Sequence, residues 1–314
     1  MAFRKIIGFG DSSFVVSLPK DWVEKNGLKK GDIVNVEQEA SELKVTPQNL
    51  KQSIAPKEIT INFEGNLKLL KSQLFNSYIN GCSLINIQKK DISNYYADIK
   101  KLVNDFVALE IIQSSGEKIV VKDYLNIQDI SIYDNLRRMD RIVMSMFDDV
   151  KEIFKGDESK KGYILERDDD VNRMYNLILK LLKKALNLND RKILNLNIEE
   201  IFYYWDLVGS LEEVADQLKR VVRYLGTSKN VDKRVIELYD QVYDHYKQAM
   251  KANFTHNEAL CLNIMNMRKE VFEKCEKYAE ELDNNSGLVL EKIKLIHSSA
   301  GNIARAYIKL GIRV

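Results

Sequence analysis

The positions of its prolines constrain this sequence more than any other feature. Pro19, Pro47 and Pro56 are the three prolines of the 314 residues, and residues 57–314 contain none. Proline inside a helix removes a backbone hydrogen bond and clashes with the preceding turn, so long helices exclude it from their interior. The chain after residue 56 is therefore free to form long helices, whereas the first 56 residues are divided into short elements.

The first 47 residues predict short strands around a very short helix. Alternating apolar residues from Phe14 indicate a strand, and Pro19 favours the start of a helix that Gly27 ends. Two further strands are expected at residues 33–37 and 43–46, forming a hairpin. A segment this short buries too little apolar surface to be stable alone, so a partner chain is expected.

The run Val-Val-Ser-Leu-Pro19 before the helix and Gly-Leu-Lys-Lys-Gly-Asp32 after it resembles the AbrB/SpoVT-like domain across residues 3–47. The resemblance implies a swapped-hairpin β-barrel formed by two chains, which binds DNA. Many bacterial members carry basic residues where this sequence has Val23 and Glu24. The expected DNA-contacting residues are therefore Arg4 and Lys5 on the first strand, the turn residues Ser12 and Ser13, and Lys20.

Charge and cysteine content restrict the function only weakly. Residues 1–57 hold nine Lys and Arg against seven Asp and Glu, so charge alone does not indicate DNA binding. Cys82, Cys261 and Cys275 lack CxxC spacing, and we expect them to be reduced core thiols of a cytoplasmic protein. Charged residues interrupt the first apolar positions and no apolar run is long enough to span a bilayer, so neither a secretory segment nor membrane insertion is expected.

The sequence predicts a multidomain α+β protein. A polar stretch follows Pro47, and beyond it the apolar pattern indicates a small α/β domain of order β-α-β-α-β-β. A rigid spacer or dimer surface is the favoured role of this middle domain, with a ligand pocket as the alternative. The expected boundaries are a DNA-binding and dimerisation domain at 1–48, a linker at 49–57, the α/β domain at 58–126, and an all-α domain at 127–314 that divides at 227/228.

The all-α part predicts six helices. Apolar residues at helical spacing indicate helices near 130–155 and 160–187, and two capping boxes, Asn197 to Glu200 and Thr255 to Glu258, open later ones. The expected helices are 130–155, 160–187, 197–225, 230–252, one starting near 255, and 288–310. Their up-down order predicts a tandem pair of three-helix bundles.

Acidic residues of the first bundle form the one candidate for metal chemistry. Asp168 and Asn172 are four residues apart, as are Glu212 and Asp216, and Asp149 falls on the inward face of the first helix. Glu212 is expected on the same inward stripe as Trp205. Antiparallel packing would bring these groups to one layer, where oxygen ligands suit a hard cation or iron. The alternative is an ordinary solvated acidic face near a helix start.

The segments Glu166-Arg-Asp-Asp-Asp-Val-Asn-Arg-Met-Tyr175 and Leu211-Glu-Glu-Val-Ala-Asp216 resemble PhoU-like proteins, phosphate-uptake regulators built from two three-helix bundles with a metal-binding E(D)xxxD motif. The first motif here ends in Asn172. The matching positions of the second bundle are Arg268, Phe272, Ser298 and Asn302, which include no acidic pair. The resemblance implies at most one divalent or iron-type metal site, in the first bundle.

An AbrB-like head joined to a PhoU-like tail resembles the phosphate-uptake regulators of archaea. The resemblance implies a cytoplasmic homodimer that binds promoter DNA and regulates phosphate transport, with the helical part sensing a metal, a phosphate-related signal or a protein. The alternative is an adaptor that acts on a transporter ATPase or a sensor kinase and uses its head only to dimerise. We do not expect an enzyme, because a carboxylate-bridged oxidase usually adds His ligands, and His245, His256 and His297 lie outside the first bundle.

Overall fold

The computed structural model of the chain separates into two compact units, residues 1–56 and 57–314. Each unit is described by itself. The residues whose structure is described are 3–11, 13–39, 42–47, 57–226 and 231–310.

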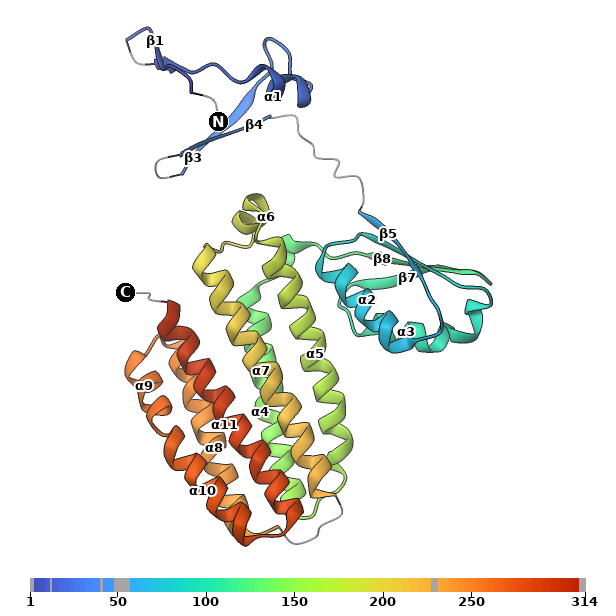
Figure 1. Ribbon diagram of the computed structural model, residues 1–314, viewed down its shortest axis with the longest axis vertical. Helices are drawn as coiled ribbons and strands as arrows, with labels where there is room; N and C mark the ends of the chain where they lie inside the picture. Colours follow the sequence, from blue (N-terminus) through green and yellow to red (C-terminus); the bar gives the residue numbers. More distant parts are fainter. Residues whose placement is uncertain (1–2, 12, 40–41, 48–56, 227–230, 311–314) are drawn as a thin grey trace. The chain divides into compact units, whose positions relative to one another are not determined.

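The N-terminal unit consists of two hairpins and one short helix (Figure 1). Strands β1 (Ile7–Phe9) and β2 (Ser13–Val15) pair antiparallel, as do β3 (Val34–Glu39) and β4 (Glu42–Pro47). Helix α1 (Lys20–Lys25) follows Pro19, whose φ of −60° suits a helix start. Gly27 has a φ of +64° just after the helix, a conformation that glycine adopts without strain.

This unit has almost no core of its own. Pro47 is the one buried residue among those described between positions 3 and 47. Apolar side chains that would fill a core are exposed instead: Phe3, Ile6, Ile7, Phe9, Phe14, Val15, Val16, Ile33, Val36 and Leu43. An exposed apolar surface of this extent marks an interaction surface.

The second unit begins with a four-stranded mixed sheet. Its strands are β5 (Glu58–Asn62), β6 (Leu84–Gln88), β7 (Leu109–Ser114) and β8 (Lys118–Asp123), in the order β5-β6-β8-β7. Strands β5 and β6 are parallel and the other pairs are antiparallel. Helix α2 (Leu67–Ile79), the 3₁₀ turn η1 (Ile92–Tyr95) and helix α3 (Tyr96–Asn104) connect the strands.

One face of this sheet forms a small core with the two helices (Figure 1). Alternate strand residues such as Ile85 and Ile87 point to the helices, because strand side chains alternate between faces. Helix α2 contributes Leu70, Leu74 and Tyr78, and α3 contributes Ile99 and Val103.

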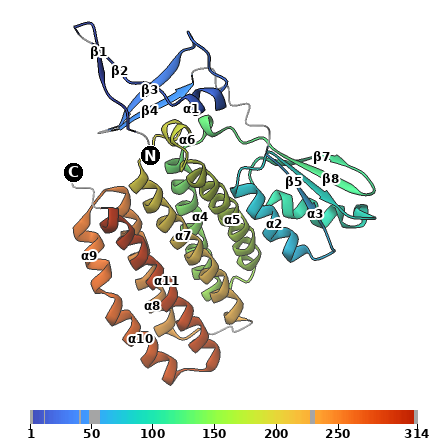
Figure 2. The ribbon, with the colours of Figure 1, turned by 45° about the horizontal axis from the view of Figure 1, so that its top comes forward.

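The rest of the unit is helical. After the 3₁₀ turn η2 (Ile127–Asp129) come α4 (Ile132–Phe154), α5 (Lys160–Lys184), α6 (Leu188–Ile193), α7 (Ile198–Leu225), α8 (Lys233–Phe254), α9 (Glu258–Asn266), α10 (Arg268–Glu281) and α11 (Asn284–Leu310). Helices α4, α5 and α7 pack on one another, and α8, α9 and α10 pack on α11, which in turn lies along α7 (Figures 1 and 2). Within the described residues, no helix is long and apolar enough to cross a membrane.

Three details differ from the six predicted helices. The predicted capping box at Thr255 is not formed: Thr255 is the C-cap of α8, and the Asn257 side chain caps α9 by accepting from the Leu260 backbone N–H. The fifth predicted helix is two helices, α9 and α10, which meet at Met267, where ψ is −8° and the backbone N–H bonds to two carbonyls at once. Asn263 and Asn266 lie just before this break, and asparagine is a poor residue for a helix interior. The short helix α6 was not predicted; the Asn187 side chain caps its start.

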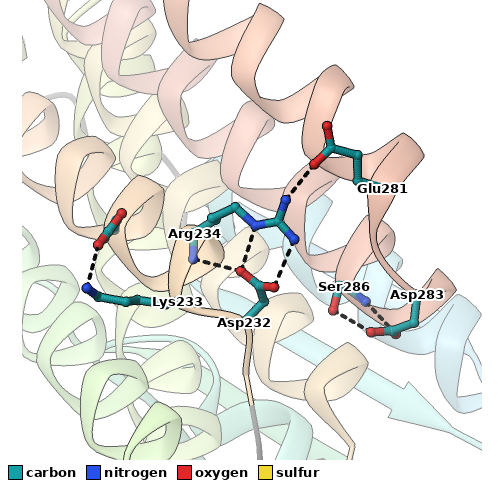
Figure 3. A network of polar contacts seen from close by, with 7 residues as sticks. Asp232, Lys233, Arg234, Glu281, Asp283 and Ser286 are labelled. Atoms are coloured by element: carbon teal, nitrogen blue, oxygen red, sulfur yellow. Dashed lines mark hydrogen bonds and ion pairs between the residues drawn. The ribbon is translucent and has the colours of Figure 1, made fainter.

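Polar contacts lie at the ends of α8, α10 and α11 (Figure 3). The Asp232 carboxylate caps α8 by accepting from the Arg234 backbone N–H at 2.8 Å and also pairs with the Arg234 guanidinium at 3.0 Å. The same guanidinium pairs with Glu281 at the end of α10. Asp283 accepts from the Ser286 hydroxyl at 2.7 Å at the start of α11. These contacts fix how the last helices begin and end.

A buried ion pair connects the sheet to the helical part. Lys180 of α5 is fully buried, and its ammonium pairs with Asp123 at the end of β8. The same ammonium lies 3.8 Å from the centre of the Tyr78 ring of α2. Four residues earlier on α5, the Asn176 amide donates to the Asp105 carbonyl at 3.3 Å. These polar contacts tie α5 to the end of β8 and to the residue that follows α3.

Removing one charge of this pair should destabilise the protein strongly. We expect Asp123→Asn to lower the free energy of unfolding by about 3 kcal/mol, because Lys180 would remain charged and buried without a partner. The double variant Asp123→Asn/Lys180→Met should recover most of that loss. The control Lys183→Met, made in the wild type, should have little effect on stability. Urea unfolding of the wild type and the three variants measures the loss of the free energy of unfolding and its recovery. Equal losses in the single and the double variant would contradict the prediction.

Two histidines meet inside the second group of helices. His245 of α8 and His297 of α11 are both buried, and their Nδ1 atoms lie 3.3 Å apart. One ring must donate and the other accept, so the accepting ring is neutral in this contact. Burial, the neighbouring His245 and Arg268 lower the pKa of His297 to about 4.

This pair predicts a loss of stability in acid. The unfolded chain protonates His297 near its ordinary pKa of 6.5, whereas the folded chain does so near 4. Stability should therefore fall as the pH drops from about 6.5 to about 4, by at most roughly 1.4 kcal/mol per pH unit. In His297→Gln, denaturant unfolding at about pH 7.5 and about pH 5 should show a smaller difference than in the wild type. An unchanged difference would contradict this assignment.

Candidate functional site

The candidate DNA-binding residues of the first unit are exposed. Arg4 and Lys5 precede β1, which corrects the expectation that they lie on the first strand. The reason is the register: the pairing of β1 with β2 begins at Ile7 opposite Val15, so residues before Ile7 have no strand partner within this hairpin. Ser13 is the first residue of β2. Ser12 lies outside the described residues.

Lys20 is the first residue of α1, and its side chain is 86% exposed. Its ammonium lies 3.6 Å from the Glu24 carboxylate one turn later. An exposed pair of this kind contributes little energy, so the lysine can exchange Glu24 for another anion. Arg4, Lys5 and Lys20 are thus three accessible cations suited to contacts with phosphate groups.

The second candidate site lies where α5 packs on α7. The Lys219 ammonium of α7 donates to the Asp168 carboxylate of α5 at 2.7 Å and lies 3.0 Å from Asp216. The Asn172 amide donates to the same oxygen of Asp168 at 3.2 Å. Glu212, one turn before Asp216, is close enough for both aspartates to affect its pKa. The structure thus brings together four of the five residues predicted to bind metal.

Asp149 has different partners. It is buried on α4, as expected, and its carboxylate pairs with Arg167 and lies 3.9 Å from Lys160, both on α5. Asp149 therefore pairs with cations of α5 and does not contact the other carboxylates of the predicted site.

Burial and crowding of like charges determine the protonation of this cluster. Burial raises the pKa of Asp168, although the hydrogen bond from Lys219 opposes the shift. Burial, followed by the charges of Asp216, Glu213 and Asp168, raises the pKa of Glu212 to about 7. Burial would lower the pKa of Lys219, but its hydrogen bonds to the two aspartates outweigh this effect and raise it.

As they lie, these residues do not fit a resident metal ion. Among the described residues, no three His, Cys, Asp or Glu side chains are grouped so that they could hold one. The position between Asp168 and Asp216 is taken by the ammonium of Lys219, which the sequence interpretation missed. Its spacing offered the signal: Lys219 is three residues after Asp216 and seven after Glu212, hence on the same face of α7.

A cavity of about 400 Å³ adjoins the cluster between α2 and α5. Asn172, Tyr175 and Asn176 line it from α5, and Lys68 and Lys71 line it from α2. Lys71 also pairs with Asp105 at 2.8 Å. Asn172 therefore belongs to both the carboxylate cluster and the wall of this cavity.

The raised pKa of Glu212 predicts a stability that falls as the pH rises. The folded state holds the proton up to a pH of about 7, whereas an unfolded Glu loses it near 4.5. Stability should decrease between these values and level off above them. Glu212→Gln, which removes this charge, should therefore be more stabilising at about pH 8 than at about pH 5. Thermal unfolding of Glu212→Gln and of Glu199→Gln, an exposed residue of the same helix, at both pH values tests this; equal effects of the two variants would refute it.

Comparisons with known proteins locate two domains in the sequence. The PhoU domain family matches residues 136–225. The family described as antidote-toxin recognition MazE, bacterial antitoxin, matches residues 9–53. Among solved structures, PhoU from Pseudomonas aeruginosa matches with 20% identity and a TM-score of 0.49, covering 57% of this chain and 95% of that one. No curated protein matches the chain.

The two matched regions agree with the resemblances carried by the sequence motifs. Residues 136–225 include α5 and α7, on which the Asp168, Glu212 and Asp216 motifs lie. Residues 9–53 include Pro19 and the two glycines around the turn at Lys29. Both families are regulatory or adaptor domains rather than enzymes. The chain thus joins an N-terminal domain of the MazE/AbrB type to a PhoU domain.

Proposed function

We propose that this protein is a DNA-binding transcriptional regulator of phosphate uptake that acts as a homodimer in the cytoplasm. The observation that carries the proposal is the presence of a MazE/AbrB-type domain and a PhoU domain in one chain. The first domain type is associated with DNA binding and dimerisation, and the second with phosphate homeostasis. In this proposal, binding of the first domain to promoter DNA is controlled by the state of the helical part.

The exposed apolar side chains of the N-terminal unit support a homodimer. Phe9 and Phe14 of the first hairpin and Val36 and Leu43 of the second are all exposed in the single chain. A second copy that contributes its own hairpins would bury these side chains in a shared swapped-hairpin barrel. Burial of apolar surface is the dominant force in such association.

A dimer also doubles the number of available cations. Arg4, Lys5 and Lys20 of two chains would give six positive groups on one assembly, with Ser13 and the neighbouring turn as hydrogen-bond donors. Contacts between cations and phosphates release counterions and supply much of the affinity of protein for DNA. We therefore assign the affinity to these cations, and the register on the duplex to the same phosphate contacts.

The helical part receives the signal in this proposal. We assign it the architecture of two tandem three-helix bundles. The first is formed by α4, α5 and α7, and the second by α8, the broken helix α9–α10, and α11. The contacts of Lys180 with Asp123 at the end of β8 and of Asn176 with Asp105 after α3 support coupling to the middle α/β domain, because they tie α5 to it. A phosphate-related signal or a partner protein that moves α5 would move the sheet as well.

The proposal predicts salt-dependent binding to DNA upstream of phosphate-transport genes. Arg4→Ala/Lys5→Ala should weaken binding and flatten its dependence on salt, by about 0.9 in the logarithmic slope for each lost phosphate contact. Lys100 and Lys101 are adjacent, exposed residues of α3. The control Lys100→Ala/Lys101→Ala removes the same amount of positive charge and should bind DNA like the wild type. Electrophoretic shifts over a range of salt concentrations measure both.

An adaptor on a transporter ATPase or a sensor kinase is the second candidate function. It is favoured by an exposed apolar stripe on α7 of the PhoU domain, formed by Ile198, Phe202 and Trp205 at spacings of four and three residues. These side chains share one face of the helix, as in surfaces that bind a partner protein. Absence of DNA binding at low salt, with the dimer intact by light scattering, would reject the regulator in favour of this adaptor.

A further inference from the structure

We propose that Lys219 is the resident cation of the carboxylate cluster between α5 and α7, and that this site in the wild-type protein does not take a metal ion. The PhoU resemblance implies a metal at these motifs, so the inference concerns how this chain departs from that pattern. It goes beyond the proposed function and holds whether or not the protein binds DNA.

The first argument is the use of the carboxylate oxygens. One oxygen of Asp168 accepts from Lys219 at 2.7 Å and from Asn172 at 3.2 Å. Of the two oxygens of Asp216, Oδ1 lies 3.0 Å from Lys219 and Oδ2 lies 2.6 Å from Arg220. A metal ion that used these three oxygens would have to compete with the N–H donors that already bond to them.

The second argument is the orientation of Asn172. Its amide nitrogen faces the Asp168 carboxylate. The reverse orientation would set the amide oxygen against a carboxylate oxygen, with no hydrogen between them. The amide oxygen, which is the atom a hard cation would bind, is therefore turned away from Asp168.

The third argument is charge and space. The side chains of Asp168, Asp216 and Lys219 are 8%, 21% and 21% exposed, so little water screens the charges. A lysine ammonium is a compact point charge, and between the two aspartates it supplies the positive charge that a metal would supply. A divalent ion at the same position would meet the ammonium at short range in a medium that screens poorly. Metal entry thus requires Lys219 to leave.

The experiment is a titration of the full chain with Mn²⁺, a divalent ion that oxygen ligands bind well. Calorimetry or electron paramagnetic resonance measures the bound ion in the wild type, in Lys219→Met and in Arg220→Met. Arg220→Met is the matched control, because it removes the adjacent cation, which also pairs with Asp216 but does not contact Asp168. Lys219→Gln provides a second test if the Met variant fails to fold by circular dichroism.

We expect no saturable binding of Mn²⁺ to the wild type or to Arg220→Met. A folded Lys219 variant should bind one ion per chain and lose it when Asp168→Asn is added. Two results would overturn the proposal. One is a stoichiometric ion in the wild type that Asp168→Asn removes, and the other is a folded Lys219 variant that binds no ion. Neither result depends on DNA, so the proposed function is tested separately.

Discussion

The packing of α11 along α7 is the contact on which the helical part depends. Helix α7 packs on α4 and α5 and also on α11, and the buried residues from Ile132 on α4 to Tyr307 on α11 form one continuous apolar cluster. Because α7 contacts helices on several sides, most of its surface is buried. Leu211, Val214 and Leu218, for example, are fully buried. Charged residues of α7 can lie only at the edges of these contacts. Glu212, Asp216 and Lys219 occupy such an edge, which explains why they are half-buried and face α5.

Much of the helical architecture could be predicted from local signals. Helices expected at 130–155 and 197–225 are found at Ile132–Phe154 and Ile198–Leu225, and the Asn197 to Glu200 capping box is present. These features depend on periodicity and on hydrogen bonds between residues close in sequence. The break at Met267 was harder to predict, because the apolar pattern continues through it. The signal was the low helix propensity of the two asparagines just before it.

The candidate site was predicted less completely, for a different physical reason. Spacing along one helix shows which residues share a face, but not which groups a neighbouring helix brings opposite that face. Asp149 is buried as expected, yet its partners Lys160 and Arg167 come from α5. Likewise Trp205, expected on the inward stripe with Glu212, is 44% exposed. In the N-terminal unit, Phe9 and Phe14 are exposed, and spacing along the sequence does not show what would cover them.

The geometry of α5 connects the two parts of the second unit in a way that neither motif reveals. Asp168, Asn172, Asn176 and Lys180 follow one another at intervals of four residues. Four residues of an α-helix turn slightly more than one revolution, so each step rotates the side chain by about 40°. The row therefore begins facing Lys219 on α7 and ends at Asp123 of the sheet. The contact of the carboxylate cluster with α7 and the anchor of the sheet therefore lie on one helix, at the two ends of a single row of polar side chains.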